Sequence, residues 1–394
     1  MKQSTGTFLR IGLPMYAVAF NGSIQFVLSI SMAGLISAFP GVRESVLMYL
    51  LTITTLMGIV GGFVLSSLVR RFSMKTLTLA GLTAGCVSAL AYLLFPTMLP
   101  VLFFASGGLG FSGGFVSTAF SLLVNIHVDE ENRGRVLGFG SGTMQFGRLA
   151  ALFLGGFLAN IRWNYVLFTY AFMLIAFLLT AFLLPQDTPA GKEHSSGQKT
   201  AIIKLVKSLG VWQLMTITLL YGGIYFLTNS HISLYIEGYG LGLPSITGTL
   251  SAVSCGLAGV VGFMFAPIYR ALKKHILWVI FFVTGAGFII AGIIISLPSI
   301  FLGIALCTVG IALFLPYFLL CISRNSDRET TPLVIAMMPV FMNIGSFMSP
   351  GIINFLVGTF SSGGAAYAYL YGGIFSVVMA FSVLVAKRWL IWAL

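Results

Sequence analysis

Long apolar segments, separated by short polar or turn-forming segments, follow one another along the whole chain. A membrane-spanning helix needs about 20 mostly apolar residues, and lipid offers its backbone no hydrogen-bond partners. Continuous apolar segments of this length therefore predict helices, whereas the strands of a membrane β-barrel would alternate apolar and polar residues. The pattern predicts twelve spans, at residues 9–37, 45–69, 76–95, 101–126, 136–160, 164–184, 211–236, 245–268, 276–297, 299–322, 333–358 and 366–386.

The composition excludes a soluble fold. Hydrophobic residues make up 58% of the 394 residues and charged residues only 8%, against roughly 25% charged residues in soluble domains. The first apolar segment, from Ile11 to about Ala38, is longer than the roughly 7–15 apolar residues of a signal peptide, so we predict that it is the first span. The four cysteines all lie within apolar segments, and we expect buried thiols.

The net charge of +12 reflects membrane topology and not a nucleic-acid partner. Lys and Arg gather in short clusters between the spans, and such clusters favour the cytoplasmic side. With the N-terminus inside, 18 of the 21 basic residues fall on the cytoplasmic side, Arg43 and Arg162 fall outside, and Arg148 falls within a span. We predict a multi-pass inner-membrane protein, monomeric, in contact with the lipid bilayer, with both termini in the cytoplasm.

The longest polar segment divides the chain into halves of six spans each. Residues 186–208 are rich in Pro, Gly, Ser and Lys, a composition that is typical of a linker. We expect a first six-helix bundle over 1–185, a cytoplasmic linker over 186–208 and a second six-helix bundle over 209–394.

The two halves resemble each other in sequence. Val60–Phe63 matches Val260–Phe263 at an offset of 200, and Met144–Gly147 matches Met342–Gly345 at an offset of 198. Since six is an even number, duplication of a six-span unit gives two units of the same orientation in the membrane. The sequence thus predicts an all-α membrane protein with two pseudo-symmetric six-helix bundles.

The loop between spans 2 and 3 reads Ser66-Ser-Leu-Val-Arg-Arg-Phe-Ser-Met-Lys75. It resembles the motif Gly-x-Leu-x-Asp-Arg-x-Gly-Arg-Arg of the major facilitator superfamily, with Arg71 and Lys75 at matching positions and Arg70 in place of the acid. The six-plus-six arrangement is similar to that family over nearly the whole chain. The resemblance implies a secondary transporter whose cytoplasmic loops, which carry Arg70, Arg71, Lys75, Arg133 and Arg270, help to close an inward gate, although Arg70 cannot replace the missing acid.

Span 5 is similar to that of the family's drug/proton antiporters. Arg133-Gly-Arg-Val-Leu-Gly138 leads into it, and Gly147 and Gly155-Gly156 follow. Two features depart from the antiporter pattern. Ala151-Leu152 stands where the signature has Gly-Pro, and Phe103–Phe115 contains no charge, so the usual Arg of span 4 is missing.

Arg148 is the strongest single candidate for a substrate contact. Burying Arg at mid-bilayer costs roughly 2.5–3.5 kcal/mol on insertion scales, so its side chain should face a cavity. No Asp or Glu lies at a comparable depth in any predicted span. One interpretation is that an anionic substrate meets the guanidinium fork. The other is that carbonyls, amide side chains and water hold the side chain in a structural role.

Neutral polar side chains within the spans form a second group of candidates. Two of them lie one turn apart on span 1, and three follow i, i+4, i+8 spacing on span 7. Spans 1, 4, 7 and 10 line the cavity in the resembled family, so these groups are expected to contact substrate. Alternatively they bond one another across helices, which contributes only about 0.6 kcal/mol each. The candidates are Asn21, Gln25, Gln145, Tyr221, Tyr225, Asn229, Asn343 and Ser346.

His231 and Glu237, toward the outer end of span 7, are the candidates for coupling to a proton, because His titrates near neutral pH. An interfacial His without a role in transport is the alternative. The sequence shows no nucleotide-binding motif, metal-ligand spacing or catalytic triad, so we expect no cofactor, no metal and no enzyme activity.

We predict a secondary active transporter that moves a small organic solute, anionic or amphipathic, across the inner membrane by alternating access. A proton or a sodium ion would be the coupling ion. The first alternative is a drug/proton-type efflux pump, which usually needs a membrane-embedded acid. A remote alternative is an intramembrane enzyme or an accessory subunit, and an enzyme would need clustered acids or histidines within the spans.

Overall fold

The computed structural model describes residues 8–69, 71–186, 208–325, 331–361 and 363–385. Within these ranges, twelve helical segments are long and apolar enough to cross a membrane, and the chain forms helices without any strand. The prediction of twelve transmembrane helices is thereby confirmed, and the chain is an integral multi-pass membrane protein. The expected linker over 186–208 lies almost entirely outside the described residues.

The helices group into two compact units. Unit 1 comprises Met1–Glu193 and Leu243–Ala252, and unit 2 comprises His194–Gly242 and Val253–Leu394. Each unit holds its own packed core, and each is therefore described by itself. The division at the linker, with the limits expected from the sequence, stays a prediction.

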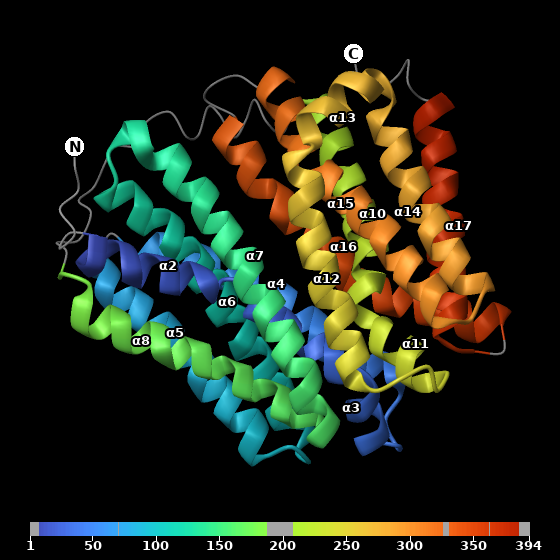
Figure 1. The fold of residues 1–394 in the computed structure, drawn as a ribbon, viewed down its shortest axis with the longest axis horizontal. Coiled ribbons are helices and arrows are strands. Elements are labelled where there is room, and N and C mark those ends of the chain that lie inside the picture. The colour runs from blue at the N-terminus through green and yellow to red at the C-terminus, as the bar shows by residue number, and fades with distance from the viewer. Residues whose placement is uncertain (1–7, 70, 187–207, 326–330, 362, 386–394) are drawn as a thin grey trace. The chain divides into compact units, whose positions relative to one another are not determined.

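Unit 1 contains spans 1 to 6. In Figure 1 these helices run from blue to green, and α5 lies alongside α8. Their bounds are η1 (Phe8–Gly12), α2 (Leu13–Phe20), η2 (Ile24–Ser31), α3 (Met32–Ala38), α4 (Glu44–Leu68), α5 (Met74–Leu94), α6 (Leu99–His127), α7 (Glu130–Ile161), η3 (Trp163–Tyr170) and α8 (Ala171–Leu183).

Glycines bring α4 and α6 into close contact. A Cβ atom built on Gly61 would overlap the carbonyl oxygen of Phe111, and one on Gly114 would overlap the backbone of Gly58. Small residues at such positions let two backbones approach in lipid, where apolar side chains gain nothing by leaving the hydrocarbon. The glycine-rich segment of span 4 therefore serves helix packing.

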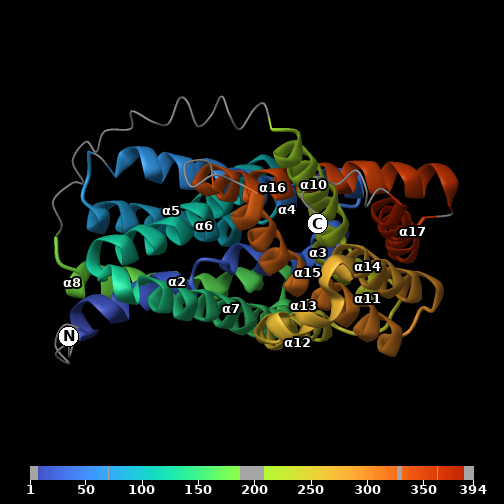
Figure 2. The ribbon, with the colours of Figure 1, turned by 90° about the horizontal axis from the view of Figure 1, so that it is seen from above.

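Unit 2 contains spans 7 to 12, except the segment Leu243–Ala252 at the start of span 8, which belongs to unit 1. Figure 2 shows α14 beside α17. There Gly285 of α14 packs against Gly373 of α17, while Gly287 packs against Gly303 of α15. The bounds are α10 (Leu209–Ser230), α11 (Ile232–Gly238), α12 (Pro244–Phe263), α13 (Phe265–Leu272), η4 (Lys273–His275), α14 (Ile276–Ile293), α15 (Leu297–Asn325), α16 (Thr331–Phe360) and α17 (Ala365–Val385).

The internal repeat appears in the helix bounds. The helices α6 and α15 both have 29 residues, and both of their ends differ by 198 positions. The short helices α3 and α11 both have 7 residues, and both of their ends differ by 200 positions. These are the offsets that the sequence matches predict, so the two pseudo-symmetric bundles are confirmed.

Spans 1 and 7 are interrupted, which the apolar pattern did not predict. Span 1 passes from α2 through a turn at Asn21–Ser23 into the 3₁₀ helix η2 before α3 begins. Span 7 breaks at His231, between α10 and α11. The pattern of apolar residues shows which segment lies in the membrane, but it does not show the backbone hydrogen bonds of that segment. A break of the helix inside an apolar segment is therefore hard to predict from the sequence. Irregular backbone at membrane depth is tolerated where protein or a cavity satisfies the freed groups.

Candidate functional site

Arg148 lies on α7 in unit 1, within the membrane-spanning window Val136–Ile161. Its side chain is half-buried, and its Cζ atom lies 4.4 Å from the centroid of the Phe26 ring on η2. A guanidinium over an aromatic face is attracted by the ring quadrupole, and a desolvated site strengthens this attraction to about 2 kcal/mol. The Phe26 ring therefore attracts the charged guanidinium of Arg148 within unit 1.

The helix crossing that positions Arg148 depends on the glycine before it. A Cβ atom on Gly147 would overlap the carbonyl oxygen of Phe20 at the end of α2, and a Cβ atom on Gly22 would lie 2.7 Å from Cε of Met144. The α7 backbone consequently passes directly against the interruption of span 1. Arg148, the next residue along α7, therefore lies near the beginning of η2, over the ring of Phe26.

Asn21 lies in the interruption itself and is only 1% exposed. Its Nδ2 donates to the carbonyl oxygens of Ala17 (2.8 Å) and Phe172 (3.2 Å). Carbonyl oxygens only accept, so these two bonds fix the orientation of the amide. The Oδ1 atom then points the other way and has no hydrogen-bond partner in the described part of the chain. A buried acceptor in this position suits a donor group from a solute.

Gln25, one residue into η2, directs its amide toward α6. Its side chain lies so close to the Cα of Gly113 that any Cβ atom there would overlap the amide. The Oε1 atom is buried without a hydrogen-bond partner among the described residues. Gln145 of α7, by contrast, is exposed in the structure. Asn21, Gln25 and Arg148 thus gather around the interruption of span 1, and Gln145 lies on the exposed side of α7.

In unit 2, α16 crosses α10 as α7 crosses α2. A Cβ atom on Gly345 would overlap the carbonyl oxygen of Leu219, and Ser346 is 6% exposed. The Ser346 hydroxyl donates to the carbonyl oxygens of Met342 (3.0 Å) and Gly222 (3.2 Å). Ser349, one turn further on, donates to the carbonyl oxygen of Gly223 (2.7 Å). In this structure Ser346 binds the two helices together. Asn343, on the same helix, is half-buried.

The three polar residues expected on one face of span 7 differ in their surroundings. Tyr221 is 0% exposed, stacks on Phe314 with centroids 4.1 Å apart, and has its hydroxyl 3.2 Å from Oγ1 of Thr284. Tyr225 and Asn229 are half-buried, and Nδ2 of Asn229 donates to Oγ1 of Thr228 (3.3 Å). Tyr221 consequently belongs to the core of unit 2, whereas Tyr225 and Asn229 remain candidates for solute contact.

The two coupling candidates lie at and beyond the break of span 7. His231 is 2% exposed, and its Nδ1 lies 2.8 Å from Oγ of Ser230. Glu237 is half-buried at the end of α11, where Oε1 accepts a 2.6 Å hydrogen bond from the Ser233 hydroxyl. His231 is therefore enclosed by protein, and its role in coupling stays a prediction.

The basic loop residues fall into different environments. Arg133 donates from Nε to the carbonyl oxygen of Val128 (3.0 Å) and from Nη2 to that of Asn125 (2.9 Å). It thereby caps the carbonyl end of α6. Arg71 and Arg270 are exposed and Lys75 is half-buried, while Arg70 lies outside the described residues.

Sequence reasoning did not single out Phe26, Ser349 or Asn354. Phe26 gives no signal in a chain that contains 35 phenylalanines. Asn354 offers a weak signal, because it follows Asn343 by 11 residues, which is three helical turns on one face of α16. The Nε2 atom of His231 is buried without a hydrogen-bond partner among the described residues.

No group of three or more His, Cys, Asp or Glu side chains in the described ranges could hold a metal ion. The four cysteines are free thiols, with Cys86 half-buried and the other three buried.

Comparison with known proteins gives one family. The model of the Major Facilitator Superfamily matches residues 15–350. The structure is similar to that of a nucleoside transporter, at 12% identity, with 95% of this chain and 99% of that chain covered and a TM-score of 0.79. It is also similar to a POT family peptide transporter, at 13% identity, with 96% of this chain and 98% of that chain covered and a TM-score of 0.74. A D-xylose–proton symporter is similar at 16% identity, with 95% of this chain and 97% of that chain covered and a TM-score of 0.67. No curated protein matches the sequence.

Proposed function

Because the chain belongs to the major facilitator superfamily, and is thus a transporter and not an enzyme, we propose that it is a secondary active transporter for a small organic anion. In this proposal the solute binds at the interruption of span 1 in unit 1. Arg148 meets its anionic group, and Asn21 and Gln25 accept hydrogen bonds from its donor groups. Alternating access would then release it on the other side of the membrane.

The observation that supports an anionic solute is the placement of Arg148. A guanidinium within a membrane span is costly, and such residues usually mark a solute pathway. Phe26 attracts the charge without neutralising it, since an aromatic ring carries no net charge. A solute carboxylate or phosphate fits the planar guanidinium fork in two-point contact. Gln145, Tyr225, Asn229 and Asn343 stay proposals for further solute contacts.

The first step of the test is to find the solute. The names of the similar structures include transporters of nucleosides, peptides and a sugar, so we would screen polar organic solutes of that size, with and without an acidic group. The purified protein is heated with each compound, and a bound solute raises the melting temperature. A compound that stabilises the protein is then used, radiolabelled, in uptake by proteoliposomes.

Arg148→Ala is expected to abolish uptake of that solute while the protein remains folded and inserted. Arg148→Lys should also be impaired, at least tenfold, because an ammonium cannot reproduce a planar two-point contact. Removal of a buried charge relieves an insertion cost, so the melting temperature should hold or rise. Arg162→Ala, which removes an exposed Arg of the same unit, is the matched control. Full uptake by Arg148→Ala would overturn the anion proposal.

We also propose an inner-membrane location with both termini in the cytoplasm, on the distribution of the basic residues. Arg43→Cys and Lys273→Cys place one new thiol at an exposed position on each predicted side. An impermeant maleimide should label Arg43→Cys in intact cells and Lys273→Cys only after permeabilisation. The reverse pattern would show that the topology is inverted.

A further inference from the structure

The connection between spans 8 and 9 is built differently from its counterpart between spans 2 and 3. Span 2 forms α4, which ends at Leu68, and α5 begins at Met74. Span 8 forms α12, which ends at Phe263, and α13 and η4 then lie before Ile276, where α14 begins. Unit 2 therefore carries a short separate helix at the ends of two of its spans (Figure 1).

The helix α13 has an inner face and an outer face. Phe265 and Tyr269, one turn apart, stack with their ring centroids 5.7 Å apart. The Tyr269 ring lies 6.4 Å from that of Tyr317 on α15, and this contact holds the inner face against unit 2. The exposed side chains of the outer face are Ala266, Pro267, Arg270 and Ala271. Arg270 is the one large side chain among these four, so a group from outside can approach its guanidinium closely.

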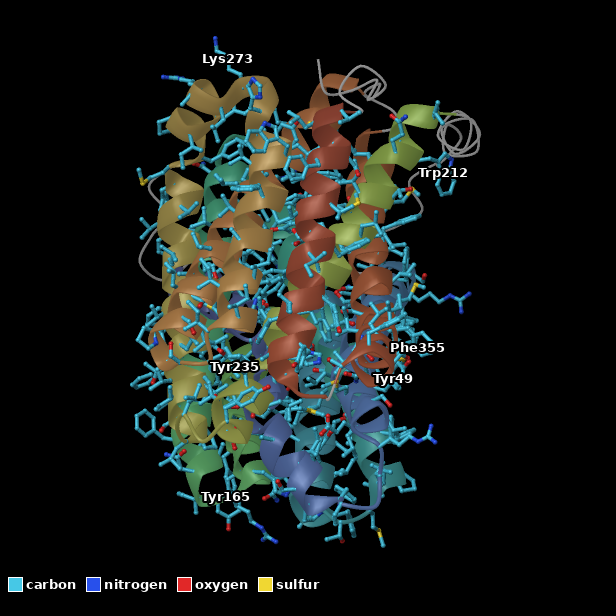
Figure 3. The ribbon with its side chains drawn as sticks, turned by 90° about the vertical axis from the view of Figure 1, so that its right-hand side faces the viewer. Tyr49, Tyr165, Trp212, Tyr235, Lys273 and Phe355 are labelled. Atoms are coloured by element: carbon cyan, nitrogen blue, oxygen red, sulfur yellow. The ribbon has the colours of Figure 1, made fainter. Side chains whose placement is uncertain are left out.

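Lys273 adds a second exposed charge directly after α13. Its φ angle is 43°, and it is the one residue other than glycine with a positive φ in the described ranges. Such an angle is unfavourable for a residue with a Cβ atom and suits glycine. Figure 3 shows the Lys273 side chain pointing away from the helices. The turn thus presents an ammonium group to the outside, at a conformational cost that glycine would avoid.

His275 and Trp278 lie at the beginning of α14, next to these charges in the chain. The indole Nε1 of Trp278 donates to Nδ1 of His275 (3.0 Å), and His275 is exposed. Because Nδ1 accepts, the ring hydrogen is on Nε2, which is then available as a donor. Indole rings are enriched at the level of the lipid head groups. The pair therefore marks this corner as part of the membrane surface.

The surroundings of the two charges favour a lipid over a soluble anion. No Asp or Glu occurs between Glu237 and Asp327, so α13, α14 and α15 bring no carboxylate of their own. Beside the charges, Phe263 is 92% exposed and Met264 is 51% exposed, at the end of span 8. An anionic phospholipid complements both features, because its head group is negative and its acyl chains are apolar.

We propose that α13 and η4 form a binding site for the head group of an anionic phospholipid. Arg270 and Lys273 attract the negative head group, and Nε2 of His275 donates a hydrogen bond to it. The acyl chains lie against Phe263 and Met264. This site is separate from the interruption of span 1, so the inference does not depend on the proposed function.

The test uses the full chain in nanodiscs without any solute. Bromine on an acyl chain quenches nearby indole fluorescence, and subtracting the spectrum of Trp278→Phe isolates Trp278 among the five tryptophans. One basic residue near an anionic surface contributes about a factor of five. Brominated phosphatidylglycerol should therefore quench Trp278 at a mole fraction at least about fivefold lower than brominated phosphatidylcholine does. Equal quenching by the two lipids would overturn the proposal.

Charge-removing variants show whether the preference is local. Arg270→Gln combined with Lys273→Gln should abolish the preference for phosphatidylglycerol. Arg71→Gln, which removes an exposed charge from unit 1, should leave it unchanged. A preference that survives the double variant would contradict the site. Inorganic phosphate, added against chloride at equal ionic strength, should not displace the lipid, and displacement would indicate a site for a free anion instead.

Lys273→Gly separates the charge from the fold. Since glycine suits the positive φ, this variant should melt no lower than the wild type in detergent without phospholipid. In nanodiscs its preference for phosphatidylglycerol should fall about fivefold. A stable Lys273→Gly variant with an undiminished preference would contradict the role of Lys273 in the site.

Discussion

The same helix crossing occurs once in each unit, and the two copies carry different chemistry. In unit 1, Gly147 of α7 lies against the carbonyl oxygen of Phe20 in span 1. In unit 2, Gly345 of α16 lies against the carbonyl oxygen of Leu219 in span 7. The residue after the glycine is Arg148 in the first crossing and Ser346 in the second. Arg148 contacts Phe26 and stays half-buried, whereas Ser346 bonds two backbone carbonyls.

This difference shows that the glycine of each crossing is required for helix packing, whereas the residue after it can differ between the two units. The glycine is retained because no side chain fits between two backbones at that distance. The residue after it differs between the two crossings, since Arg148 contacts the ring of Phe26 and Ser346 bonds two backbone carbonyls. Duplication thus supplies two equivalent scaffolds, and a charged site has been placed on only one of them.

The largest expected effect comes from filling the crossings themselves. Gly147→Ala and Gly345→Ala each place a methyl group on a carbonyl oxygen, and overpacking of this kind costs about 1–3 kcal/mol. We expect both variants to melt at lower temperature and to give less folded protein. Gly142→Ala is the matched control on α7, because nothing lies within 4 Å of its Cβ position. There Ala should stabilise the helix by up to about 1 kcal/mol. Equal melting of all three variants would contradict the packing account.

The next effect concerns the amide of Asn21, which lies in the interruption of span 1. Asn21→Asp replaces the Nδ2 donor with an oxygen that faces the carbonyl oxygens of Ala17 and Phe172. Losing a buried donor costs about 1–3 kcal/mol, so the melting temperature should fall at pH 7. Asn132→Asp, an exposed position in the first turn of α7, should change little, since an acid there suits the helix dipole. A stable Asn21→Asp variant would show that the amide orientation differs.

A smaller effect is expected at two arginines near helix ends, Arg133 in unit 1 and Arg270 in unit 2. Arg133→Ala removes two hydrogen bonds to the end of α6 and should cost about 1 kcal/mol of unfolding free energy. Arg270→Ala, at an exposed position of α13 in unit 2, should cost nothing measurable. Figure 3 shows the neighbouring Lys273 pointing away from the helices. Thermal melting of both variants measures the difference, and a larger loss for Arg270→Ala would reverse the comparison.

The smallest effect belongs to Ser346, the counterpart of Arg148. Ser346→Ala removes a hydroxyl that bonds two carbonyls within unit 2, and such interhelical bonds contribute about 0.6 kcal/mol in membranes. We expect a small fall in melting temperature and uptake close to that of the wild type. Loss of uptake in a stable Ser346→Ala variant would mean that the second crossing also contacts the solute.

The spans could be predicted because each one is a local property. Twenty apolar residues in a row cross a membrane as a helix whatever their neighbours are, so the number and sequence of the spans followed from hydropathy alone. The repeat was visible for a related reason. Gly147 and Gly345 cannot be replaced where two backbones touch, so their spacing persists while the residues around them change.

The candidate site was only partly accessible to sequence reasoning. The charge of Arg148 is visible in any apolar segment, and its unit 1 neighbours Asn21 and Gln25 stand out as polar. Tyr221 looked equivalent to Tyr225 by spacing, yet it is buried against Phe314 and Thr284. Helical periodicity places residues on one face but does not tell which neighbouring helix that face meets.

The sequence by itself determined the membrane location, the twelve helices, the duplicated plan and the one charge placed deep within a span. Only the tertiary structure decided where spans 1 and 7 break, that Phe26 lies beneath Arg148, and that His231 is buried with its ring against Ser230. The physical reason is the range of the forces. Partition into lipid acts on each segment separately, whereas a ring contact or a shared proton requires atoms from helices far apart in the chain to come within a few ångströms.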